Sequence, residues 1–100
     1  ISQETGEKIW ELPLYDEFHE QIKSTVADIK NVGGRPGGVI TAAAFLSNFA
    51  ADLPWIHLDI AGTAWTQDGT FERSYNPKGA TGFGIRTLVN LLAEDRSGKL

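Results

Sequence analysis

The sequence contains no cysteine and no methionine among its 100 residues. Without cysteine it can form neither a disulfide framework nor a thiolate metal site, which fits a reducing compartment. No apolar run approaches the roughly 20 residues that a membrane-spanning helix needs, and the N-terminus lacks the basic head and apolar core of a signal peptide. These absences predict a soluble chain without a targeting or membrane segment.

Positive charge is also scarce. Nine Lys and Arg residues stand against 13 Asp and Glu residues, for a net charge of −4. Residues 1–30 hold seven acids and three bases and so carry the whole excess, whereas residues 31–100 hold six of each. Because no basic stripe is present to neutralise phosphates, nucleic acid is a poor candidate partner.

The remaining composition is that of a globular protein, with 41% hydrophobic and 22% charged residues, and it argues against disorder. One hundred residues make one domain or a part of one. A chain that starts at Ile1 and contains no methionine is expected to be a piece of a longer protein.

Hydrophobic periodicity predicts a mixed α/β order. Apolar residues at four-residue spacing predict a short amphipathic helix over residues 14–23. A glycine-rich loop, residues 31–38, precedes a helix over residues 39–51 that is apolar nearly all round, so we expect this helix to be buried on several sides. Residues 55–60 alternate like a strand. A helix of this kind beside a strand indicates α/β layers, which 100 residues cannot easily complete alone.

Other segments give weaker signals. Residues 1–7 are typical of a frayed helix end with Gly6 as its stop, and residues 8–12 of a short strand or extended entry. Residues 66–79 are turn-rich and predict a surface loop. Thr81 is the expected N-cap of a final helix, whose apolar stripe is formed by Ile85, Leu88, Val89 and Leu92.

Few side chains suggest chemistry. His57 and Asp59 lie two apart on the predicted strand and so point to one face; they could form a metal pair or an acid–base pair, but a buried hydrogen-bonded pair is the preferred interpretation. His19, among acids on the first helix, is expected to be solvated. The glycine-rich loop is not a phosphate loop, because Val39 and Ile40 follow it where Lys and Ser or Thr would be required.

Five sequence blocks, taken in order, resemble the cytosolic leucine aminopeptidase family. They are Gly6–Leu14 (Gly-Glu-Lys-Ile-Trp-Glu-Leu-Pro-Leu), Ala27–Gly33 (Ala-Asp-Ile-Lys-Asn-Val-Gly), Thr41–Leu46 (Thr-Ala-Ala-Ala-Phe-Leu), Trp55–Gly62 (Trp-Ile-His-Leu-Asp-Ile-Ala-Gly), and Lys78–Gly82 together with Arg86–Leu88. One block alone would be weak, but five in the same order across nearly the whole chain are specific. The resemblance implies the C-terminal part of a three-layer α-β-α di-metal exopeptidase domain, so that residues 1–100 would be an incomplete domain.

The resemblance also implies what the chain does and what it lacks. The family removes N-terminal amino acids from peptides with two divalent ions, zinc or manganese, held by a lysine, three aspartates and a glutamate. No residue of this chain matches those ligands, so no catalytic residue and no metal ligand is expected here, and the chain alone is expected to be inactive. Block alignment places Val32, Ala61 and Ala64 in the walls of the substrate pockets.

The same resemblance implies peptide substrates, the rest of the catalytic domain as a partner, a cytoplasmic homo-hexamer, and no membrane. A truncated, non-catalytic fragment that acts as a structural or interaction module stays an alternative. An unrelated small α/β binding domain would require the ordered blocks to be coincidence. The sequence upstream of Ile1 would distinguish the first two.

Overall fold

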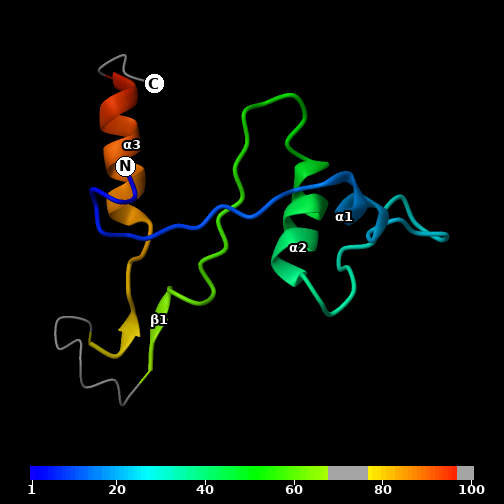
Figure 1. The fold of residues 1–100 in the computed structure, drawn as a ribbon, viewed down its shortest axis with the longest axis horizontal. Helices are drawn as coiled ribbons and strands as arrows, with labels where there is room; N and C mark the ends of the chain where they lie inside the picture. Colours follow the sequence, from blue (N-terminus) through cyan, green and yellow to red (C-terminus); the bar gives the residue numbers. More distant parts are fainter. Residues whose placement is uncertain (68–76, 97–100) are drawn as a thin grey trace. The chain divides into compact units, whose positions relative to one another are not determined.

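The computed structural model of the protein describes residues 1–67 and 77–96. Its elements, in chain order, are α1 (Asp16–Glu20), α2 (Gly38–Ser47), β1 (Trp65–Thr66), β2 (Gly79–Ala80) and α3 (Ile85–Arg96) (Figure 1). They fall into two compact units: the first comprises Ile1–Trp10 and Asp59–Leu100, and the second Glu11–Leu58. Helices with a small sheet are compatible with the expected α/β class.

The second unit is built on α1 and α2, which pack against each other. Ile22 and Ala44 are its buried apolar residues, 1% and 0% exposed. Beyond α1 the chain closes a small loop, in which Lys23 bridges to Ile29 and the Lys30 N–H donates to the Ile22 carbonyl at 2.7 Å. This loop thus binds the backbone of the buried Ile22.

The first helix is shorter than predicted. Residues 14–23 were expected to be helical, but α1 covers Asp16–Glu20. The chain then tightens into turns, since the N–H groups of Ile22 and Lys23 donate to the carbonyls three residues earlier, as is common at helix ends.

Helix α2 also differs from its expected form. It ends at Ser47 rather than at residue 51, because the side chains of Ser47 and Asn48 both donate to the Ala44 carbonyl at 2.8 Å and compete with the helical ladder. The prediction that it is buried all round is wrong for this structure. Only Thr41 and Ala44 are buried in it, whereas Leu46 and the following Phe49 are 41% and 70% exposed.

The first unit contains a single N-terminal turn, β1, β2 and α3. The Thr5 N–H donates to the Ile1 carbonyl at 3.0 Å, and Gly6 closes the turn with φ 71°. Residues 1–7 thus form a turn rather than the end of a helix, with Gly6 at the predicted stop. Strands β1 and β2 pair antiparallel, with Trp65 opposite Ala80. The sequence analysis missed this pair, which lies at the two ends of its predicted loop over residues 66–79; residues 68–76 of that loop lie outside the described part.

Two segments with strand-like sequences form no strand. Residues 8–12 are irregular, as the looser expectation of an extended entry allowed, and residues 55–60 form no strand. The prediction of a strand over residues 55–60 is therefore wrong for this structure. Within residues 1–67 and 77–96, no neighbouring strand pairs with this segment, and a β-strand needs such a neighbour to satisfy its backbone.

Helix α3 carries the predicted apolar stripe, but the stripe is exposed. Its four residues are between 48% and 64% exposed, namely Ile85, Leu88, Val89 and Leu92. Among the described residues, no helix is long and apolar enough to cross a membrane.

The loop before α2 packs closely onto the helix at one glycine. A Cβ added to Gly33 would meet the Thr41 side chain at 2.7–2.9 Å, whereas a Cβ on Gly38 would meet nothing within 4 Å. Thr41 has little room to move, because it is 2% exposed and its hydroxyl donates to the Gly38 carbonyl at 3.2 Å. Gly33 is therefore required by the close approach of the loop to the helix.

We predict that Gly33→Ala lowers the free energy of unfolding by about 1–3 kcal/mol, the usual cost of overpacking a filled site. The matched change Gly38→Ala adds the same methyl group at the open start of α2, where alanine favours helix, and should stay within about 1 kcal/mol of the parent. Urea unfolding followed by circular dichroism measures both. Equal effects of the two substitutions would contradict the packing described.

Candidate functional site

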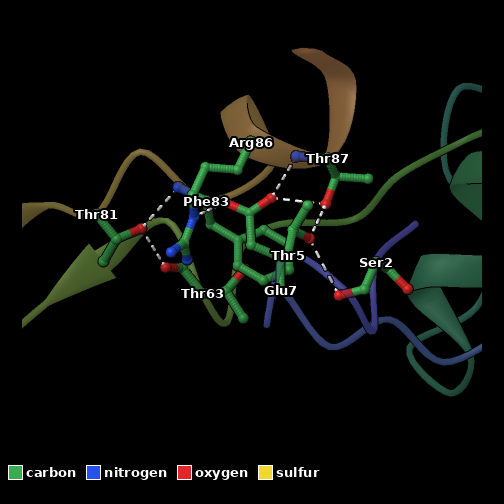
Figure 2. Close-up of polar contacts among 8 residues, drawn as sticks. All are labelled: Ser2, Thr5, Glu7, Thr63, Thr81, Phe83, Arg86 and Thr87. Atoms are coloured by element: carbon green, nitrogen blue, oxygen red, sulfur yellow. Dashed lines mark hydrogen bonds and ion pairs between the residues drawn. The ribbon is translucent and has the colours of Figure 1, made fainter. Parts of the chain in front are cut away.

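The first unit contains a buried carboxylate, that of Glu7, whose side chain is 3% exposed. Its Oε2 atom accepts hydrogen bonds from the Thr87 N–H at 2.9 Å and from the Thr87 hydroxyl at 2.7 Å. Its Oε1 atom faces the Arg86 Nε at 3.4 Å. Figure 2 shows these contacts converging on the carboxylate from the first turn of α3.

The position of Glu7 follows from the needs of a helix N-terminus. The first N–H groups of a helix have no partner within it, and the helix dipole favours a negative charge there. The first turn of α3 contains no acidic residue of its own. Glu7, 80 positions away in sequence, supplies the missing acceptor and charge.

These contacts also fix the ionisation of Glu7. The hydrogen bond from the Thr87 hydroxyl is the main cause that lowers the pKa of this carboxyl to about 2. Burial acts in the opposite direction, while the backbone of Thr87, the Arg86 side chain and the backbone of Gly84 lower the pKa further. The folded unit therefore binds the ionised carboxylate.

A second threonine holds the N-terminal turn in register with α3. The Thr5 hydroxyl lies 3.0 Å from the Thr87 hydroxyl and donates to the Ser2 carbonyl at 3.1 Å (Figure 2). Thr87 thus contacts both Thr5 and Glu7, which orients the carboxylate toward the helix.

Thr81 joins the segment before α3 to the turn before β1. Its hydroxyl donates to the Thr63 carbonyl at 2.6 Å and accepts from the Phe83 N–H at 3.2 Å. Its N–H donates to the Ala64 carbonyl at 3.0 Å. The prediction that Thr81 is the helix N-cap is wrong, because the Leu88 N–H donates to the Gly84 carbonyl and α3 starts at Ile85.

Two of the predicted pocket residues, Ala61 and Ala64, lie on this turn. The N–H groups of Thr63 and Ala64 both donate to the Ile60 carbonyl, at 2.9 and 2.8 Å, and the exposed Asp59 carboxylate accepts from the Ala61 N–H at 2.8 Å. Ala61 is exposed and Ala64 half-buried. The structure thus places both on one short hydrogen-bonded turn.

The third predicted pocket residue, Val32, belongs to the second unit. It lines a cavity of about 290 Å³ between the glycine-rich loop and the start of α2. The Val32 side chain is 68% exposed. The full lining comprises Asn31, Val32, Gly33, Gly34, Arg35, Gly38, Thr41 and Ala42.

The surroundings of His57 and His19 differ from those predicted. The preferred interpretation of His57 and Asp59 as a buried pair is wrong, because Asp59 is exposed and its carboxylate accepts from the Ala61 N–H. His57 is half-buried and its ring stacks on Trp55 with centroids 6.2 Å apart. His19 is half-buried rather than fully solvated.

The described residues do not fit a metal centre. Within residues 1–67 and 77–96, no group of three or more His, Asp or Glu side chains is close enough to hold an ion. A stable protein site for a divalent transition metal usually needs at least three such ligands. The arrangement seen here can shape and hold a surface.

The sequence analysis did not identify Glu7 as a functional candidate. The available signal was an absence: the helix that starts at Ile85 has no acid in its first turn. That signal predicts an acceptor from elsewhere, but 13 acids are present in the chain and only the fold selects one of them.

We predict that Glu7 makes stability depend on pH in the acid range. The pKa of Glu7 in the folded chain is about 2, below the ordinary glutamate value of about 4.3. The contribution of Glu7 to the free energy of unfolding is therefore complete above pH of about 5 and is lost as pH falls toward 2. In urea unfolding of the chain across this range, Glu7→Gln should flatten the decline of the unfolding free energy. Glu4→Gln, at an exposed site on the same turn, should leave the decline unchanged; equal slopes for all three proteins would contradict the role of Glu7.

Comparison of the chain with known proteins identifies a family. The family model described as cytosol aminopeptidase family, catalytic domain, matches residues 1–89. Over 92 residues the chain is 55% identical to a probable cytosol aminopeptidase of Cenarchaeum symbiosum (strain A), covering 91% of the chain and 19% of that protein. Over 87 residues it is 59% identical to a probable cytosol aminopeptidase of Desulfotalea psychrophila, covering 87% of the chain and 17% of that protein.

A third relative extends the match to the end of α3. Over 99 residues the chain is 52% identical to a probable cytosol aminopeptidase of Desulforapulum autotrophicum, covering 98% of the chain and 19% of that protein. The chain therefore spans less than a fifth of the length of the curated relatives that it matches. By this family match and these identities, the chain belongs to the cytosol aminopeptidase family.

Proposed function

We propose that this chain is the C-terminal segment of the catalytic domain of a di-metal leucyl aminopeptidase, an enzyme that removes N-terminal amino acids from peptides. The observation that carries the proposal is an identity of 52–59% to proteins named probable cytosol aminopeptidase along 87–99 residues of the chain. Such identity across nearly the whole chain extends well beyond a single motif.

The role of the segment in that enzyme is to form pocket walls and part of the core. Ala61 and Ala64 line the pocket for the N-terminal side chain of the substrate, and Val32 lines the pocket on the leaving side. Small and apolar residues suit these positions, because such pockets select by shape and by burial of apolar surface. The shared turn of Ala61 and Ala64 and the cavity beside Val32 support this assignment.

The remaining properties of the proposed enzyme belong to the complete polypeptide. It adopts a three-layer α-β-α domain, assembles as a homo-hexamer in the cytoplasm, and uses two divalent ions, zinc or manganese, which supply Lewis acidity at the scissile carbonyl. Their ligands come from outside this chain. The apolar stripe of α3, exposed here, is of the kind that the rest of such a domain would cover.

The first test compares the chain with the complete polypeptide. We expect the purified 100-residue chain to hydrolyse no leucine 4-nitroanilide, and the complete polypeptide to hydrolyse it in a way that a chelator abolishes and zinc or manganese restores. Metal-dependent hydrolysis by the chain, free of full-length enzyme, would contradict the assignment of the ligands. A complete polypeptide without peptidase activity would favour the structural or interaction module instead.

The second test addresses the pocket wall. In the complete enzyme, Ala64→Leu should penalise leucine substrates more than alanine substrates, because a misfit of one or two methylenes in an apolar pocket changes specificity by roughly 10- to 200-fold. The measurement is the ratio of kcat/KM for the two anilides. Ala93→Leu makes the same change at an exposed position of α3 and should leave the ratio unaltered. An unchanged ratio with a lowered melting temperature in Ala64→Leu would show that Ala64 is small only for packing.

A further inference from the structure

One short backbone segment, residues 81–87, is hydrogen-bonded to Glu7 at one end and to the turn that carries Ala64 at the other. Glu7 binds Thr87 in the first turn of α3. Six residues earlier in the chain, Thr81 binds the Thr63 and Ala64 carbonyls. Figure 2 shows the two ends of this segment, with Phe83 and Arg86 between them.

The segment between Thr81 and Thr87 is held in one conformation. The Phe83 N–H donates to the Thr81 hydroxyl at 3.2 Å, and the Ile85 N–H donates to the Gly82 carbonyl at 3.2 Å. Gly82 and Gly84 adopt φ values of 68° and 94°, a region that L-residues rarely occupy, so the backbone path is specific. A displacement of the start of α3 would therefore move Thr81.

The turn itself has few other supports. Residues 61–63 are exposed. Within the turn, the N–H groups of Thr63 and Ala64 and the Thr63 hydroxyl donate to the Ile60 carbonyl, and the Asp59 carboxylate accepts from the Ala61 N–H; the pairing of Trp65 with Ala80 follows directly. Segments with few buried contacts open readily. The turn is thus joined to the segment before α3 by the hydrogen bonds from Thr81 and by the neighbouring pair of Trp65 with Ala80, and of these only the Thr81 hydroxyl bond contacts the exposed part of the turn.

We propose that Glu7 is a positioning residue that fixes the turn over residues 60–64 through α3 and Thr81, and thereby sets the width of the pocket for the substrate's N-terminal side chain. The effect on specificity rests on the proposed function; the effect on the turn does not. Glu7 touches no substrate in this scheme. It acts by holding the wall at a fixed place.

The experiment uses the complete enzyme that contains this chain, in its metal-loaded form. Four variants are compared with the parent: Glu7→Gln, Thr81→Val, the double variant, and Glu4→Gln as the matched control. Two readouts are taken for each: deuterium uptake of peptides covering residues 60–66, and kcat and KM for leucine and alanine anilides.

We expect Glu7→Gln and Thr81→Val each to speed exchange at residues 60–66 and to lower the leucine-to-alanine ratio of kcat/KM roughly tenfold, mainly through KM for the leucine substrate. The double variant should be no worse than either single variant, because both break the same path. Glu4→Gln should match the parent in both readouts.

Two results would overturn the proposal. The first concerns activity: faster exchange with an unchanged leucine-to-alanine ratio of kcat/KM, or with an equal fall of kcat for both substrates, is what a merely structural role would give. The second concerns the path: exchange in Glu7→Gln that equals that of the parent, or losses of specificity in the double variant that equal the sum of the two single variants, would show that Glu7 does not act through Thr81. Absence of activity in the parent enzyme would refute the proposed function, and the exchange data alone would then decide whether Glu7 holds the turn.

Discussion

The pairing of one buried carboxylate with one helix N-terminus organises the first unit. Glu7 accepts from the backbone and hydroxyl of Thr87 and so provides α3 with the acceptor that its own first turn lacks. Because an unpaired buried charge would be costly, the N-terminal turn and α3 must form together. In our proposal, the turn over residues 60–64 is positioned through the same pairing.

The second unit depends on a different constraint, the close approach of a loop to a helix. Gly33 lies against the Thr41 side chain, where a Cβ would not fit, and the cavity beside Val32 forms along the same contact. The first unit is thus held by charge and hydrogen bonds, and the second by shape. In both, the residues that hold the backbone differ from those proposed to face substrate.

Several large apolar residues are exposed, as is expected of a chain that covers only part of the length of its relatives. Phe49, Leu53 and Leu92 are 64–73% exposed, although Phe49 and Leu92 belong to segments predicted as apolar helix faces. The chain spans 17–19% of the length of the relatives compared, and exposed apolar surface of this kind is typical of interfaces. The helix predicted to be buried all round shows the same mismatch, since its apolar faces meet too few neighbours within the described residues.

Ordered motifs, hydrophobic spacing and a glycine suited to left-handed backbone are local signals, and from them the family, the helical segments and the stop at Gly6 could be predicted. The ends of α1 and α2 could not be predicted, because local turns and the Asn48 side chain set them. Nor could the sequence show that residues 55–60 form no strand, because a strand depends on a neighbouring strand to pair with. Which of the 13 acids would cap α3 could not be predicted, and it is the fold that brings Glu7 to this helix. Such a contact spans 80 positions, and no periodicity or local propensity encodes which distant group will meet a helix end.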